Sequence, residues 1–177
     1  PTLAKIAESS GIQMLTVHGR TRDQFYTGHA DWNFIQNIKN AVKIPVIANG
    51  DISSKVDADA CLQASGADGI MVGRGALGQP WLIGQLAHYL RTGEMLPAPN
   101  LPEQAKIHIN HYQEILTAYG VIRGVKIARK HLGWAIARLP NSATYQAEIN
   151  AADRPDAVIG LLQDIYSRAA DTLQKAA

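Results

Sequence analysis

Residues 42–78 constrain the fold of this chain more than any other stretch. They contain two short apolar runs, 44–48 and 69–72, and each is followed at once by a polar cluster that contains glycine. A short apolar run bounded by such residues is typical of a buried strand. Because helix-forming residues separate the two runs, the stretch is predicted to form a strand, a crossover helix and a second, parallel strand.

The two polar clusters have the composition of an anion site. They consist of Asn49, Gly50 and Asp51 after the first run, and Gly73, Arg74 and Gly75 after the second. Glycines let the backbone approach a ligand closely, and the N–H groups of a turn and the following helix start suit a phosphate. In barrels of eight parallel strands, the loops after the last two strands commonly bind phosphate. We therefore expect these loops to bind an anion.

The same unit occurs once more, earlier in the chain. An apolar run over 14–17 ends at His18, so the strand ends at His18, Asn49 and Gly73 lie 31 and 24 residues apart, the size of a strand–helix unit. Helices are expected over 2–10, 31–41, 54–66 and 80–93, with Asp31 and Ser53 or Ser54 as N-caps. Three consecutive units predict an α/β fold with a parallel sheet over 1–93.

Three units are too few for a closed barrel, which takes eight strands and about 250 residues. We therefore expect residues 1–93 to contain the last three strands of a partial TIM (β/α)8 barrel. The chain would then be the C-terminal portion of a longer protein. A small, open three-stranded α/β sheet is the alternative.

Residues beyond this part carry helical patterns. Residues 94–100, with two prolines, are expected to be a linker. Helices are predicted over 102–119, over 121–139 and from 153 onward, with a polar loop over 140–152. Residues 101–177 are therefore predicted to form an all-α helical bundle domain.

Positive charge is concentrated in one of these helices. The stretch 121–138 contains no acid and five cations, namely Arg123, Lys126, Arg129, Lys130 and Arg138, whereas the remaining residues contain 12 cations and 15 acids. At helical spacing, Arg123, Lys126 and Lys130 lie opposite an apolar stripe made of Val121, Val125, Ala128, Leu132 and Leu139. Such a face suits nucleic-acid phosphates. The alternative is a solvated surface, although such surfaces usually interleave acids.

Three single residues each allow two interpretations, one functional and one structural. His18 ends a strand, where it could contact a ligand or be structural. Trp134 could stack on a base or pack against the α/β part. Cys61, the only cysteine, lies mid-helix and is expected to be a core residue and not a nucleophile.

The lone cysteine excludes an internal disulfide and a cysteine-based metal site. No apolar run approaches the 18 residues that span a bilayer. These features predict a soluble, cytoplasmic protein with no metal and no membrane partner.

The chain resembles the C-terminal half of the tRNA-dihydrouridine synthases, in particular the bacterial B subfamily. The matching segments are 18–22 with Tyr26, Gly28, Ala30, Asp31 and Trp32, then 45–52, 66–69, 73–75 and 123–134. They occur in the family's order. The last segment, joined to a helical domain, is the most specific, because the Asn-Gly-Asp and Gly-Arg-Gly pieces also suit other flavin barrels.

The resemblance implies a flavoprotein that reduces uridine in tRNA to 5,6-dihydrouridine with FMN and NADPH. It implies that the FMN phosphate is held by Asn49, Gly50, Asp51, Gly73 and Arg74, with His18 near the flavin ring, and that tRNA is bound by Arg123, Lys126, Arg129 and Lys130. The family's general-acid cysteine belongs to the earlier half of the barrel, and Cys61 does not match it. The chain alone is therefore expected to be inactive and to bind FMN poorly.

Two other functions stay open. One is a different FMN-barrel oxidoreductase that acts on a small molecule, for which a cationic helical domain has no use. The other is a non-catalytic RNA-binding module in which the sheet is only a scaffold.

Overall fold

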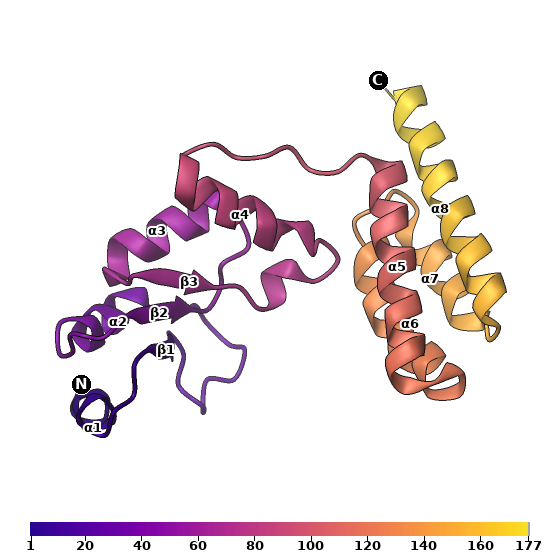
Figure 1. Ribbon diagram of the computed structural model, residues 1–177. Helices are drawn as coiled ribbons and strands as arrows, with labels where there is room; N and C mark the ends of the chain where they lie inside the picture. The colour runs from indigo at the N-terminus through magenta and orange to yellow at the C-terminus, as the bar shows by residue number, and fades with distance from the viewer. Residues whose placement is uncertain (177) are drawn as a thin grey trace. The chain divides into compact units, whose positions relative to one another are not determined.

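The computed structural model describes residues 1–176 and divides the chain into two compact units. The first comprises residues 1–76 and 80–96, and the second comprises residues 77–79 and those from 97 onward. Figure 1 shows strands in the first unit and helices in the second. The two units have separate hydrophobic cores, so each is described by itself.

The first unit alternates helices and strands. In chain order it contains α1 (Thr2–Ser9), β1 (Leu15–His18), α2 (Trp32–Lys39), β2 (Val46–Asn49), α3 (Lys55–Ser65), β3 (Gly69–Met71), the 3-10 turn η1 (Arg74–Ala76) and α4 (Trp81–Thr92). The strands form one parallel sheet in the order β1-β2-β3. The prediction of an α/β fold with three parallel strands is confirmed.

The predicted caps explain where two of these helices begin. The Asp31 carboxylate accepts the backbone N–H of Phe34 at 2.9 Å, and Ser54 Oγ accepts that of Asp57 at 3.1 Å. Each cap satisfies one N–H group that the first helical turn leaves without an intrahelical partner. The sequence signals for α2 and α3 are thus confirmed to within two residues.

The strand register places three strand-end side chains on one face of the sheet. His18 pairs with Asn49, and Asn49 pairs with Met71, so the three occupy equivalent positions at the carboxyl ends of β1, β2 and β3. Side chains alternate between faces along a strand. Ala48 and Val46, one and three residues before Asn49, are fully buried in the core with α2 and α3. His18 and Asn49 therefore lie on the opposite face.

That opposite face is apolar and open. Met71 is 47% exposed there, and Thr16 is also exposed. A hollow of about 470 Å³ lies along the face and is bordered by α4. Its lining consists of Met14, Thr16, Ile47, Ile70, Met71, Val72, Ile83, Leu86, Ala87 and Leu90. Parallel sheets are ordinarily covered on both faces. Within the α/β unit, α2 and α3 cover the face that carries Val46 and Ala48.

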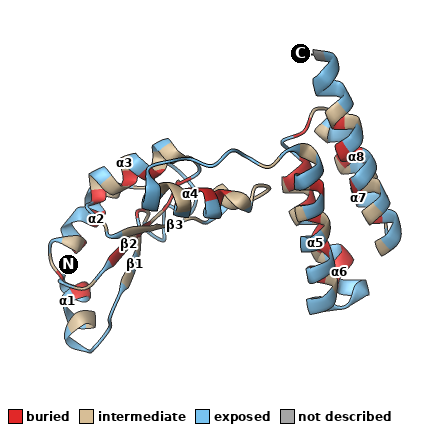
Figure 2. Cartoon of the chain, turned by 45° about the horizontal axis from the view of Figure 1, so that its top comes forward, coloured by how far each residue is buried: buried red, intermediate tan, exposed pale blue. Residues whose placement is uncertain are grey.

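The second unit consists of α5 (Leu101–Tyr119), α6 (Val121–Ile136), α7 (Ser142–Ala151) and α8 (Pro155–Ala176). The side chain of Asn100 and that of Glu103 form a reciprocal capping box at the start of α5. Tyr112, Ile136 and Ile165 are among the fully buried side chains of its core. In Figure 2 the buried positions appear in red between exposed positions along α5 and α6, as expected of helices with one apolar stripe.

Two sequence expectations for this unit are wrong. Residues 142–151, predicted to be part of a polar loop, form α7, because several alanines favour a helix even though only Tyr145 and Ile149 are buried. Val121, predicted to lie in the apolar stripe of α6, is 52% exposed, since it is the first residue after the turn at Gly120. The rest of the predicted stripe, from Val125 to Leu139, is buried.

In residues 1–176, no helix combines the length and apolar character needed to cross a membrane.

Candidate functional site

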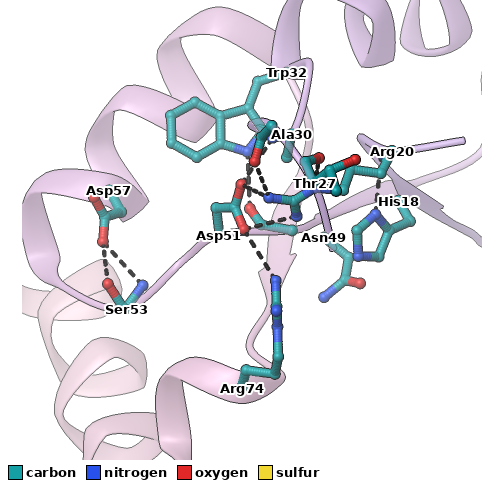
Figure 3. Close-up of polar contacts among 12 residues, drawn as sticks. His18, Arg20, Thr27, Ala30, Trp32, Asn49, Asp51, Ser53, Asp57 and Arg74 are labelled. Carbon is teal, nitrogen blue, oxygen red and sulfur yellow. Dashed lines mark hydrogen bonds and ion pairs between the residues drawn. The ribbon is translucent and has the colours of Figure 1, made fainter. Parts of the chain in front are cut away.

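Two strand ends and three loops of the α/β unit meet at the carboxyl edge of its sheet. Figure 3 shows His18, Arg20, Asn49, Asp51 and Arg74 gathered there, from β1, β2 and the loops that follow β1, β2 and β3. These include four of the six residues predicted to bind cofactor; the other two, Gly50 and Gly73, belong to the same two loops. The parallel sheet brings them together because the ends of its strands lie side by side.

A two-pronged ion pair joins the loops after β1 and β2. Arg20 donates from both terminal nitrogens to the Asp51 carboxylate, Nη1 at 2.7 Å and Nη2 at 2.6 Å. The same guanidinium donates to the carbonyls of Thr27 and Gly28. The Arg20 side chain is only 5% exposed and that of Asp51 is 23% exposed. Such a bidentate pair fixes the geometry of both partners.

Asp51 is an ionised carboxylate by virtue of its surroundings. Burial alone would raise its pKa, but the hydrogen bonds from Arg20 and from the backbone N–H of Ala30, with the charges of Arg20 and Arg74, hold the pKa below its ordinary value. The residue itself has a positive φ of 57°. Asp51 therefore stays charged at neutral pH and organises the cations around it.

Only glycine fits at position 50. Its φ is 120°, and a β-carbon there would lie 2.8 Å from the Ala30 methyl carbon and 3.2 Å from His18 Cε1. Its carbonyl accepts the indole N–H of Trp32 at 2.9 Å. The backbone at Gly50 therefore packs directly against the imidazole of His18, and this contact holds the ring in place.

His18 and Asn49 each make one hydrogen bond at this edge. His18 Nδ1 accepts the backbone N–H of Arg20 at 3.0 Å, so in the neutral ring the proton is on Nε2. The Asn49 side-chain amide donates to the carbonyl of Met71 at 2.7 Å. Both side chains are thereby oriented on the open face of the sheet.

Arg74 is the cation that the site presents to solvent. Its side chain is 53% exposed, it lies 3.5 Å from Asp51, and its guanidinium stacks over the Tyr26 ring at 4.6 Å. Beside it, a β-carbon added to Gly73 would meet no heavy atom within 4 Å. An oriented, half-exposed guanidinium next to open backbone suits a phosphate-sized anion.

Sequence reasoning missed Arg20, Tyr26 and Trp32 as site residues. Arg20 directly follows the His-Gly pair at the end of β1, so its position was a usable signal. Its pairing with Asp51, 31 residues away, has no local signal.

The predicted cations of α6 divide into two groups. Arg123, Lys126 and Lys130 are exposed; Arg123 lies over the Tyr119 ring at 5.7 Å, and Lys130 lies over the Trp134 ring at 5.0 Å. Arg129 instead donates to the Asp153 carboxylate at 2.7 Å and to the Ala152 carbonyl at 3.4 Å. Its charge is partly neutralised where α6 meets the turn between α7 and α8.

Cys61 is a core residue, as predicted. It is fully buried in α3, and burial raises the pKa of its thiol to about 11. It is therefore not a proton donor or nucleophile for the sheet-edge site. Within residues 1–176, no group of three or more His, Cys, Asp or Glu side chains could hold a metal ion.

The α/β unit thus has the architecture of proteins that bind a phosphate-bearing ligand at the carboxyl ends of parallel strands, and it is followed by a helical unit with a cationic face. The chain belongs to the dihydrouridine synthase family, whose match extends over residues 2–171.

Individual relatives agree with this assignment. The chain is 58% identical over 172 residues to a probable tRNA-dihydrouridine synthase of Rickettsia conorii, covering 97% of this chain and 52% of that protein. It is 48% identical to tRNA-dihydrouridine synthase B of Xanthomonas axonopodis, over 94% of this chain and 50% of the relative. It is 46% identical to the Pseudomonas putida protein of the same name, over 97% of this chain and 51% of the relative. The chain thus spans about half the length of these relatives.

Proposed function

We propose that this chain is the C-terminal part of an FMN-dependent tRNA-dihydrouridine synthase, which reduces uridine in tRNA to 5,6-dihydrouridine with NADPH as reductant. Membership of the family supports the reaction class. The structural observation that carries the proposal is the convergence of His18, Asn49 and Arg74 at one edge of a parallel sheet.

The α/β part is proposed to be the last three strand–helix units of a TIM barrel. Residues 1–93 would belong to the barrel, 94–100 would be the linker, and 101–177 would be the helical tRNA-binding domain. The apolar, open face of the sheet, with its hollow of about 470 Å³, supports this proposal, because the inward face of a barrel sheet is packed against other strands.

The sheet-edge site fits an FMN phosphate by charge and by space. Gly73 has open space where a side chain would stand, and the Arg74 guanidinium is half exposed beside it. Gly50 and Asn49 would complete the cradle from the neighbouring loop, and His18 would lie near the ring system. When bound, reduced flavin supplies the hydride for the uracil base.

Asp51 belongs to the cofactor site in a different way from Arg74. A carboxylate repels a phosphate, so Asp51 would act by orienting the guanidinium groups of Arg20 and Arg74. It can also accept a hydrogen bond from a ribityl hydroxyl group.

The cationic face of α6 is proposed to hold the tRNA backbone, through Arg123, Lys126, Arg129 and Lys130. A stacked base cannot reach a flavin in a pocket, so the target uridine must be extruded. Contacts to the surrounding phosphates would position the tRNA while this happens.

The proposed general acid lies outside this chain. Cys61 is buried in α3 with a raised pKa, so it cannot substitute for the cysteine that the family uses. We therefore expect the 177 residues alone to be inactive and to bind FMN poorly.

An activity assay tests the proposal directly. Unmodified tRNA is incubated with FMN and NADPH and either the complete protein that contains this chain or the 177-residue chain, and dihydrouridine is measured by mass spectrometry of the digested tRNA. The complete protein should form dihydrouridine and the isolated chain should not. A complete protein that reduces no uridine would refute the proposal.

A further inference from the structure

A polar hollow lies between α6 and α7, beside two of the cations of α6, Arg129 and Lys130. It has a volume of about 340 Å³ and is open to solvent. Its lining consists of Arg129, Lys130, Gly133, Trp134, Gln146 and Asn150. These described residues include two cations, one indole and two amides, and no carboxylate.

The indole of Trp134 is held in a defined orientation. The Lys130 ammonium lies 5.0 Å from the ring centroid, and the His131 ring meets the indole edge-on at 5.3 Å with an interplanar angle of 89°. His111 of α5 in turn meets His131 edge-on at 5.1 Å. A fixed aromatic ring at a half-buried position is a platform on which a nucleobase can stack.

Two amide side chains of α7 also line the hollow. Gln146 Nε2 donates to Asn150 Oδ1 at 3.1 Å along one side of α7. This bond leaves the Gln146 carbonyl oxygen as an acceptor and the Asn150 NH2 group as a donor. Paired amide groups of this kind read the adjacent donor and acceptor on the edge of a base.

Gly133 makes room for this arrangement. A β-carbon at position 133 would lie only 2.5 Å from Gln146 Oε1. The absence of a side chain on this turn of α6 is therefore what lets the Gln146 amide approach the helix beside Trp134. A methyl group there would push the amide out of place without removing any polar group.

We infer that this hollow binds one unstacked nucleotide of the RNA, with its base against Trp134, its edge at Gln146 and Asn150, and its phosphate at Lys130. The inference rests on the proposed function, since it adds a base-binding site to a surface proposed to bind RNA through phosphates alone. A site for phosphate only would need neither the amide pair nor the space at Gly133.

Gly133→Ala tests the site in the 177-residue chain. Alanine favours a helix more than glycine does, so the variant should fold. Its affinity for a tRNA transcript should fall at least about fivefold, the smallest effect typical of one stacked base. The matched control is Gly160→Ala in α8, where an added β-carbon would meet nothing within 4 Å, and its affinity should be unchanged.

Tryptophan emission gives a second readout. Pentauridylate or pentaadenylate should quench the emission of the unaltered chain, and the quenching should be lost in Trp134→Phe, which keeps Trp32 and Trp81. Wild-type tRNA affinity in Gly133→Ala, with no quenching in the unaltered chain, would overturn the nucleotide site and leave the proposed function standing. Failure of the unaltered chain to bind tRNA at any salt concentration would overturn both the site and the proposed role of α6.

Discussion

The sheet edge of the α/β unit and the outer face of α6 both carry arginine or lysine side chains. They differ in how far these side chains are buried and paired. At the sheet edge Arg20 is almost fully buried and doubly bonded to Asp51, and Arg74 is positioned by Asp51 and Tyr26. On α6 the cations Arg123, Lys126 and Lys130 are exposed and contact rings or solvent.

This difference separates two kinds of anion recognition. Internal ion pairs orient a guanidinium before the ligand arrives, which suits a small ligand that must be held in one geometry. Exposed cations attract an extended polyanion and release its counterions, with little demand on geometry. The same residue types therefore predict a cofactor site in one region and an RNA surface in the other.

The largest expected effect is a difference between the two units in how acid changes their stability. Burial lowers the pKa of His108, which stacks near Tyr166 in the helical unit, to about 4. Its neutral form stabilises the fold above pH 6.5, and this stability is lost as the pH falls toward 4. The loss amounts to about 3 kcal/mol in the free energy of unfolding.

The α/β unit should behave differently in the same range. The pKa of Asp51 lies below its ordinary value, so the stability that its ion pair contributes is present at pH 4 and is lost only as the pH falls further. Hydrogen exchange in urea, read separately from backbone amides of the α/β unit and of the helical unit between pH 7 and 4, measures the difference. His108→Phe should flatten the profile of the helical unit; a profile that is already flat in the unaltered chain would contradict the account.

Removing Arg20, the buried cation of the sheet edge, tests whether its ion pair with Asp51 stabilises this site. Arg20→Ala leaves the Asp51 carboxylate without its main partner and should lower the free energy of unfolding by about 2–3 kcal/mol, at the lower end for a broken buried pair because Asp51 is partly exposed. Urea denaturation measures the loss. The exposed Arg22, substituted by alanine, should change stability by less than about 0.5 kcal/mol. Equal effects for both variants would show that the ion pair has no special role.

Charge reversal tests whether α6 acts through exposed charge. Lys126→Glu with Lys130→Glu should weaken tRNA binding by about 30-fold at 0.1 M salt and reduce the slope of log affinity against log salt, because at least two phosphate contacts are lost. The matched control reverses Lys106 and Lys175, which are exposed on α5 and α8. If the control lost as much affinity, net charge and not the α6 face would explain the binding.

Much of the fold could be predicted because its signals are local. Caps at Asp31 and Ser54, short apolar runs and strand-end glycines lie within a few residues of the structure they specify, and the structure bears them out. Helix α7 gave no such signal, since its two buried residues do not make an apolar stripe.

The site could be predicted only in part, for the same reason. Parallel strand ends place His18, Asn49 and the loop containing Arg74 together whatever the details of packing. The bond between Arg20 and Asp51, and that between Arg129 and Asp153, depend on the folded positions of distant segments. Sequence spacing therefore predicted where the charged residues lie, but it could not predict which of them form ion pairs with each other.

The affinity of FMN for the complete protein, with and without Arg74, tests the central distinction most directly. Arg74→Gln should raise the FMN dissociation constant by about tenfold or more, the value of one charge-assisted hydrogen bond, and leave tRNA affinity within about twofold of the unaltered protein. Arg22→Gln serves as the control for charge. An Arg74→Gln protein that holds FMN as tightly as before, or that loses tRNA instead, would contradict the assignment of the sheet edge to the flavin phosphate.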